Sequence, residues 1–129
     1  MSRMDHAMRP EEVTLRDGRT ILLRPARMED AESTLRNVNR IGQEEIYIMI
    51  ERVPDLQQER RWLSGFDGVR NVLFVAVANG EVIGATDSHA GTFPKDAHVG
   101  GIGIAIQEGW REVGLGRRMM VRVLEWMRS

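Results

Sequence analysis

One stretch of the sequence, residues 97–128, constrains the fold of the chain more than any other. Its first part carries β-branched residues among small ones and predicts a strand that ends at Ile106. Its last part, from about Gly114 to Arg128, has an apolar face and a charged face at helical spacing, which predicts an amphipathic helix. A glycine-rich turn joins the two, with the sequence Arg-Glu-Val-Gly-Leu-Gly over residues 111–116.

The strand, turn and helix together predict a site for a phosphate group. The first N–H groups of a helix have no partner within the helix, and the helix dipole favours negative charge beside them. Two common phosphate loops fit this turn less well. A P-loop would need Lys-Ser/Thr after its last glycine, and a dinucleotide fingerprint that starts at Gly114 would need a third glycine where Met119 stands.

The composition is that of one soluble globular domain. The chain has 129 residues, and its net charge of −1 gives no electrostatic footprint for nucleic acid or an anionic membrane. No apolar run is long enough to span a membrane, and no signal-peptide core precedes the domain. The chain has no cysteine, which excludes disulfides and a cysteine nucleophile and suits a cytoplasmic location. No His/carboxylate spacing predicts a metal site.

The N-terminal part of the sequence predicts a tail and a β-hairpin. We expect residues 1–11 to be a disordered tail and residues 12–129 to form one domain. Strands over 12–16 and 20–24 flank Asp17-Gly18. An Asp-Gly pair favours a tight turn of the primed type, because it accepts the positive φ angles that such a turn requires.

Two helices are predicted after the hairpin. The first follows Arg27 and stops at Gly42. Its apolar face is predicted from the helical spacing of Met28, Ala31, Leu35, Val38 and Ile41. The second opens at Asp55, which forms a capping-box-like pair with Gln58, and ends near Gly65.

The middle of the chain predicts a second hairpin. Residues 71–78 are a nearly continuous apolar run, typical of a central strand covered on both faces. Asn79-Gly80 predicts a two-residue hairpin turn, and residues 81–90 form the return strand. With the strand that ends at Ile106 and the last helix, the predicted order is β-β-α-α-β-β-β-α.

The glycine-rich turn matches the pattern Arg/Gln-x-x-Gly-x-Gly/Ala at Arg111, Gly114 and Gly116. On these residues, and on the order of elements over residues 12–128, the chain resembles the GNAT (Gcn5-related) N-acetyltransferase family. The resemblance implies an α+β fold, an α/β sandwich in which a mostly antiparallel sheet has helices on both faces. Compared with that family, the chain is expected to lack the usual C-terminal strands and helix.

The resemblance also implies an activity and a cosubstrate. We expect an acetyl-CoA-dependent N-acetyltransferase that moves an acetyl group by direct transfer to a primary amine of a small molecule or of a peptide N-terminus. In the family, the turn binds the pyrophosphate of acetyl-CoA and the preceding strand lies along the pantetheine. Carried over to this sequence, the cofactor-binding residues are Ile104, Ala105, Ile106, Arg111, Glu112, Val113, Gly114, Leu115, Gly116 and Arg117. Arg118 is a further source of positive charge.

The catalytic base and the acceptor pocket are less constrained by the sequence. Some family members place a glutamate about ten residues before the first motif position, where this chain has Gly100-Gly101. His98 is the candidate base because histidine ordinarily titrates near neutral pH, and His89 and Asp87 are further candidates. In the family, the region between the first two helices helps to form the acceptor pocket. This implies contacts with a cationic amine from Glu44, Glu45 and Tyr47.

Two alternatives to an active enzyme remain open from the sequence. One is a non-catalytic acyl-CoA-binding or interaction module, and the other is a fragment that needs a partner chain. The strand over 99–106 is expected to be a free edge, and apolar edges pair with other chains, so a homodimer through this strand is a candidate assembly. The sequence does not identify the acceptor amine.

Overall fold

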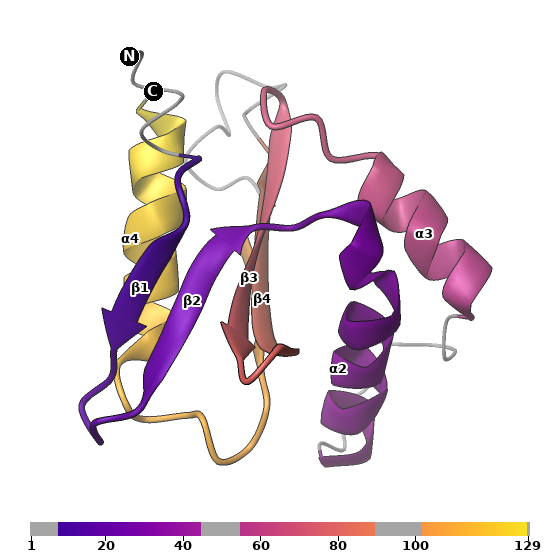
Figure 1. Cartoon of the computed structure of the whole chain (residues 1–129). Coiled ribbons are helices and arrows are strands. Elements are labelled where there is room, and N and C mark those ends of the chain that lie inside the picture. The colour runs from indigo at the N-terminus through magenta and orange to yellow at the C-terminus, as the bar shows by residue number, and fades with distance from the viewer. Residues whose placement is uncertain (1–7, 45–54, 90–101, 129) are drawn as a thin grey trace.

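The computed structural model describes residues 8–44, 55–89 and 102–128 (Figure 1). These residues form, in chain order, β1 (Glu11–Thr14), β2 (Thr20–Pro25), the short 3₁₀ helix η1 (Met28–Asp30), α2 (Ala31–Glu44), α3 (Leu56–Ser64), β3 (Asn71–Ala78), β4 (Glu81–His89), β5 (Ile102–Ile106) and α4 (Leu115–Met127). The predicted order β-β-α-α-β-β-β-α is therefore confirmed. The boundary between a disordered tail and the domain stays a prediction, and β1 starts at Glu11.

The strands form one antiparallel sheet in the order β1-β2-β3-β4-β5. β3 lies in the middle, and its residues Val72 to Ala76 are all buried, as its apolar run predicts. β5 pairs with β4 on one side only and is the edge of the sheet among the described residues. Strands that are consecutive in the chain are neighbours in the sheet, a common arrangement, although β2 and β3 are connected through η1, α2 and α3.

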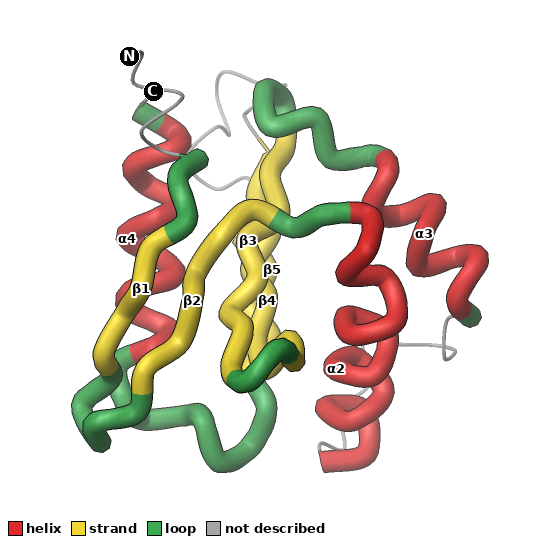
Figure 2. The backbone as a smooth tube through the Cα atoms, in the orientation of Figure 1, coloured by secondary structure: helices red, strands yellow, loops and turns green. Residues whose placement is uncertain are grey.

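The sheet lies between helices (Figure 2), and its two faces carry separate apolar cores. Alternate residues of β3 point to opposite faces, so Val72 and Phe74 pack against Met119 and Val123 of α4. Leu73 and Val75 pack on the other face, together with residues of the α2 and α3 layer. Figure 1 shows α4 on one side of the sheet and α2 and α3 on the other. The predicted sandwich with helices on both faces is confirmed.

One predicted turn is wrong and the other is confirmed. Asp17-Gly18 does not form a two-residue primed turn, because β1 and β2 are joined by the five-residue loop 15–19 and only Gly18 has a positive φ, of 92°. The N–H of Leu15 donates to the carbonyl of Arg19 and the N–H of Gly18 donates to the carbonyl of Leu15, while the Leu15 side chain is buried. Asn79 and Gly80 have φ values of 53° and 78°, the signature of the predicted primed turn.

The first helix differs from its prediction in two ways. It continues through Gly42 to Glu44, because a glycine inside a helix costs only about 1 kcal/mol and does not by itself stop it. Its buried face is also more polar than predicted. Met28 is 49% exposed, whereas Thr34 and Asn37 are 2% and 1% exposed. These polar side chains are tolerated inside because they have hydrogen-bond partners there, such as the carbonyl of Ala31 for the Thr34 hydroxyl.

Candidate functional site

The end of β5 is fixed to its surroundings by the buried residue Gln107. Its backbone N–H donates to the carbonyl of Ile83, which extends the pairing of β5 with β4 by one residue. Its side-chain amide donates to Asn37 Oδ1 of α2 at 2.9 Å and to the carbonyl of Val82 at 3.2 Å. Asn37 and Gln107 are both buried, so each needs such a partner. No pattern in the sequence predicts this pair, which ties the start of the turn to α2.

The turn after Gln107 is held in a compact shape by its own groups. The N–H of Trp110 donates to the carbonyl of Gln107, and Gly109 has a φ of 91°. Arg111 folds back, and its Nε donates to the carbonyl of Ile106 at 2.7 Å. Glu112 has a φ of 62°, an uncommon value for a residue with a side chain. Arg111, the first residue of the motif, therefore binds the end of β5 and also contributes positive charge.

The N-terminus of α4 presents backbone N–H groups at the end of this turn. Gly114 is the N-cap residue, with a φ of 92°, and Leu115 is buried and anchors the helix. The first backbone hydrogen bond of the helix runs from the N–H of Arg118 to the carbonyl of Gly114. The N–H groups of residues 115–117 precede it and so have no acceptor within the helix. No acidic residue lies in the first turn of α4, which leaves the positive end of the helix dipole uncompensated by its own side chains.

Two arginines from the β1–β2 loop support the turn from the opposite end of the sequence. The backbone N–H of Arg16 donates to the carbonyl of Val113 at 3.0 Å, and its Nη2 donates to the carbonyl of Glu112 at 3.2 Å. Arg19 donates to the carbonyl of Gly109 at 2.5 Å, and its guanidinium lies 3.8 Å from the centre of the Trp110 ring. The turn thus receives positive charge from a distant loop, and no local sequence signal identifies these contacts.

Two arginines of α4, Arg117 and Arg118, differ in the contacts that they make. Arg117 is exposed beside the turn. Arg118 forms an ion pair with Glu11 of β1. Arg118 is therefore held toward the β1 side of the molecule, whereas Arg117 is the better placed of the two to meet a ligand at the helix N-terminus.

The strand residues of the predicted cofactor site lie at the edge of the sheet. Ile104 is 40% exposed, while Ala105 and Ile106 are half-buried. Opposite them on β4, Thr86 pairs with Ile104 and Gly84 pairs with Ile106. β5 therefore uses one edge for the sheet and, among the described residues, leaves the other edge without a strand. An edge of this kind presents backbone N–H and carbonyl groups to a ligand.

The predicted catalytic and acceptor residues are mostly not described. His98, Glu45 and Tyr47 lie outside the described residues. Glu44 is the last residue of α2, and only its backbone is described. The further base candidates Asp87 and His89 are described and lie on β4 with their side chains 3.8 Å apart, Oδ2 to Nε2.

Within the described ranges, no cluster of three or more His, Asp or Glu residues could hold a metal ion. None of the helices in the described part of the chain combines the length and the apolar character needed to cross a membrane.

The glycine at the N-cap of α4 allows a test of the backbone shape of the turn. We expect Gly114→Ala to cost about 1–2 kcal/mol, because its φ of 92° is strained for any other residue. The added Cβ would also lie 3.4 Å from Arg16 Nε, so the variant should loosen the turn and weaken anion binding. Thermal unfolding and calorimetric titration with acetyl-CoA would measure the two effects.

The matched control for this variant is Gly80→Ala. Gly80 has a φ of 78° and no neighbouring atom within 4 Å of an added Cβ, and it lies in the β3–β4 turn. The Gly80→Ala variant should lose a similar free energy of unfolding and keep the wild-type affinity for acetyl-CoA. Equal loss of affinity in both variants would mean that the shape of the α4 turn does not matter for binding.

Comparisons with known proteins identify the family and the fold. The model of the acetyltransferase (GNAT) family matches residues 38–129, more than half of the chain. The structure is similar to an acetyltransferase of the GNAT family from Streptococcus pneumoniae, with a TM-score of 0.74 and 20% identity over 84% of this chain and 67% of that chain. It is also similar to ribosomal-protein-alanine N-acetyltransferase from Brucella melitensis, with a TM-score of 0.68 and 22% identity over 82% of this chain and 66% of that chain.

A third similar structure is an acetyltransferase from Salmonella typhimurium with its cofactor acetyl-CoA, with a TM-score of 0.68 and 17% identity over 84% of this chain and 63% of that chain. The chain thus spans about two thirds of the length of these structures. At these identities, structural likeness establishes the fold. A search of curated protein sequences finds no significant match.

Proposed function

The chain belongs to the acetyltransferase (GNAT) family, and on this premise we propose that it transfers an acetyl group from acetyl-CoA to a primary amine of a small molecule or of a peptide N-terminus. The observation that carries the proposal is the unpaired N-terminus of α4 behind the turn that ends at Gly114. Family membership makes acetyl-CoA the expected anion for this site.

The turn and the first residues of α4 fit the pyrophosphate of acetyl-CoA. The N–H groups of residues 115–117 lack helical acceptors, and the first turn of α4 carries no carboxylate that would compete with a phosphate. Arg117 adds an exposed positive charge, and Arg16 adds another from the neighbouring loop, whereas the charge of Arg19 is paired with Asp17. We therefore assign the pyrophosphate to the backbone of residues 112–117, with Arg16, Arg111 and Arg117 raising the local positive potential.

β5 is the element that would hold the reacting end of acetyl-CoA. In our proposal, backbone groups of Ile104, Ala105 and Ile106 pair with the amides of the pantetheine along the free edge of the strand. One strand N–H would donate to the thioester oxygen, where negative charge develops during transfer. The rigid pairing of β5 with β4 supports this role, because a donor that is already in place needs no rearrangement during the reaction.

The acceptor side of the proposal rests on the family resemblance. We assign contacts with the amine to Glu44, Glu45 and Tyr47, and we keep His98 as a candidate base. The similar enzyme from Brucella melitensis acts, by its name, on an alanine of a ribosomal protein. That substrate is a reason to include peptides with an N-terminal alanine among the acceptors tested. Pairing of two copies through β5 stays a candidate assembly, and the cytoplasm stays the expected location.

The test is a titration followed by a turnover assay on the full chain. Calorimetry with acetyl-CoA should give saturable binding. Release of CoA is then followed with a thiol reagent during incubation with a panel of amines, and the chain itself gives no background because it has no cysteine. Binding with turnover supports the proposal. Binding without turnover on any amine would instead make the chain an acyl-CoA-binding module, and absence of binding would overturn the proposed role of the turn.

A further inference from the structure

Asp87 of β4 reaches the edge of the sheet through a gap left by Gly103. The two residues are direct partners in the pairing of β4 with β5. A Cβ added at Gly103 would lie 2.6 Å from Asp87 Oδ1, a distance that real Cβ atoms do not show. The carboxyl group therefore occupies the space over Gly103 that a side chain would take. Because β5 is the edge strand, this places a carboxyl group beside the strand assigned to the pantetheine.

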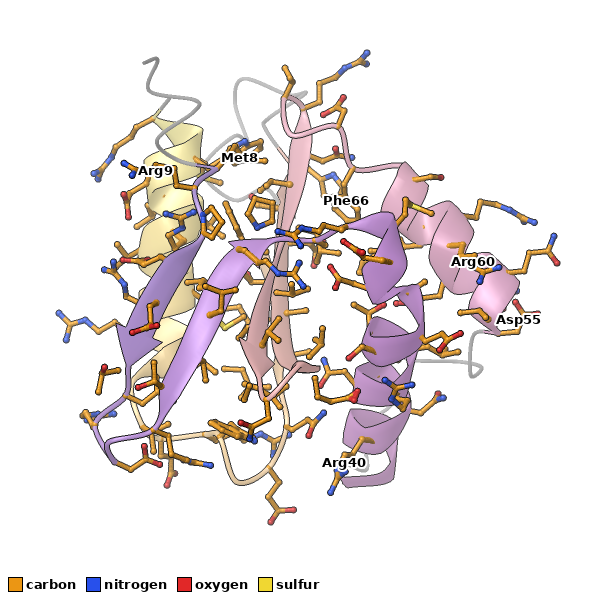
Figure 3. All side chains as sticks on the ribbon, viewed as in Figure 1. Met8, Arg9, Arg40, Asp55, Arg60 and Phe66 are labelled. Atoms are coloured by element: carbon orange, nitrogen blue, oxygen red, sulfur yellow. The ribbon has the colours of Figure 1, made fainter. Side chains whose placement is uncertain are left out.

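The carboxyl of Asp87 lies on the face of the sheet that carries α2 and α3. Its partner on β3, Leu73, belongs to the apolar core on that face, and opposite residues in a sheet share a face. His89 follows on the same face, and its ring stacks on Phe66 with ring centres 6.4 Å apart. Phe66, labelled in Figure 3, lies between α3 and the sheet, and Trp62 of α3 packs edge-on against it. Asp87 is therefore a half-buried acid, and its neighbour His89 lies against the ring of Phe66.

This surrounding changes the acidity of Asp87. Burial raises the pKa of the carboxyl group, and the nearby imidazole of His89 offsets only part of that increase. Among the described residues, His89 is the titratable side chain that acts on the Asp87 carboxyl group. A carboxylate whose pKa is raised is a better proton acceptor than an exposed one.

We propose that Asp87 binds the acceptor amine as its ammonium ion and accepts a proton from it during acetyl transfer. The inference rests on the proposed function and adds a residue to it. An amine that attacks a thioester held along the free edge of β5 from the α2 and α3 face passes over Gly103, where the carboxyl group lies. Charge pairing would hold the ammonium there, and proximity to the thioester would follow from the pairing of the two strands.

The proton and electron balance of this step is closed. The ammonium gives one proton to the Asp87 carboxylate, and the freed lone pair of nitrogen forms the bond to the thioester carbon. The carbon–sulfur bond breaks, and sulfur leaves with its electron pair. The second nitrogen proton, lost as the amide forms, passes through water to sulfur and gives the CoA thiol. Asp87 then returns its proton to solvent, so that one proton is released overall.

The main test is Asp87→Asn, which keeps the shape of the side chain and removes its charge. We expect kcat/KM at neutral pH to fall by roughly 100-fold or more, the usual range for loss of general base catalysis. The affinity for acetyl-CoA should stay within about twofold, since Asp87 is outside the turn. As the pH approaches the pKa of the amine, deprotonated amine accumulates without help from a base. The difference in kcat/KM between Asp87→Asn and the wild type should therefore narrow. A structural role alone would not produce this pH dependence.

A second variant tests the gap itself. Gly103→Ala should displace the Asp87 carboxyl group and lower activity, and the double variant with Asp87→Asn should lose little more than Asp87→Asn alone, because both changes act through one group. Glu12→Gln on β1, at the opposite edge of the sheet, is the control and should keep the wild-type dependence of kcat/KM on pH.

The outcomes separate this inference from the proposed function. Full activity of Asp87→Asn across the pH range, with wild-type turnover intact, would overturn the role of Asp87 and leave the acetyltransferase proposal standing. If the wild type binds acetyl-CoA without turnover, calorimetry with 2-phenylethylamine and with an alanine-initiated tetrapeptide in the presence of CoA still tests the ammonium site. At least one probe should then bind about tenfold more weakly to Asp87→Asn, and absence of such a difference for both would overturn the inference.

Discussion

Replacing Gly116 with glutamate is expected to abolish measurable binding of acetyl-CoA while the fold is retained. Gly116 is the second residue of α4, and its N–H lies among those without a helical acceptor. A carboxylate in the first turn of a helix is favourable for the helix itself. It would nevertheless repel the pyrophosphate at a cost of several kcal/mol, which corresponds to a loss of about 100-fold or more in affinity. Calorimetric titration measures the loss, and thermal unfolding checks the fold.

The matched control is Gly116→Ala. Gly116 does not have a positive φ, and an added Cβ would lie 3.6 Å from Ile106 Cδ1, an ordinary contact. We expect this variant to bind acetyl-CoA within a few-fold of the wild type, which would show that charge rather than bulk causes the loss. Wild-type affinity in Gly116→Glu would mean that the anion binds elsewhere, and the assignment of the turn would have to be withdrawn.

Replacing Asp30 with alanine is expected to cost about 3–5 kcal/mol of folding free energy, because it leaves a buried charge without its partner. Asp30 and Arg24 are 6% and 8% exposed, and they form two hydrogen bonds of 2.8 Å each. Asp30 also accepts the backbone N–H of Arg27 at 2.7 Å, at the start of η1. The loss should appear as a fall of ~10–20 °C in the unfolding temperature.

The neighbouring acid offers a control on the same turn. Glu29 pairs with Arg27 at 3.5 Å, but both side chains are more than half exposed. Glu29→Ala should therefore change stability by less than about 1 kcal/mol. If the Asp30 and Glu29 variants had similar stabilities, the buried pair would contribute no more than a surface pair, contrary to the prediction.

The Asp30 pair also predicts a dependence on pH. Burial raises the pKa of Asp30. The hydrogen bonds from Arg24 and from the N–H of Arg27 together lower it by more, so the net pKa lies below its ordinary value of 3.8. A carboxyl group with a lowered pKa stabilises the fold fully above its unfolded pKa and loses that contribution as the pH falls through its folded pKa. The difference in unfolding temperature between wild type and Asp30→Ala should therefore be constant near neutral pH and narrow under strongly acidic conditions.

The parts of the fold that were predicted correctly have signals within a few residues of each other. Asp55 and Gln58 exchange two hydrogen bonds of 2.8 and 2.9 Å at the start of α3. Asn79-Gly80 forms its primed turn because both residues accept positive φ angles. Each pattern reports a preference of the local backbone, and these preferences agree with the tertiary structure here.

The predictions that failed concern choices that local patterns do not determine. The buried face of α2 carries Thr34 and Asn37, because their partners lie inside the protein and make polar burial tolerable. Asn37 bonds to Gln107, a residue 70 positions away, and no spacing within the helix reports this. The loop around Gly18 likewise follows the burial of Leu15 rather than the preference of an Asp-Gly pair for a tight turn.

The sequence by itself determined the order of strands and helices and the location of the glycine-rich turn before α4, because β-branched runs, helical spacing and glycines act on the backbone nearby. Only the tertiary structure decided what surrounds that turn. Arg16 and Arg19 reach it from a loop that lies 96 and 90 positions away from their partners, and Asp87 reaches the edge strand because Gly103 has no side chain. Such contacts depend on how strands are paired and how layers are packed, and the chain brings these residues together only once the sheet has formed.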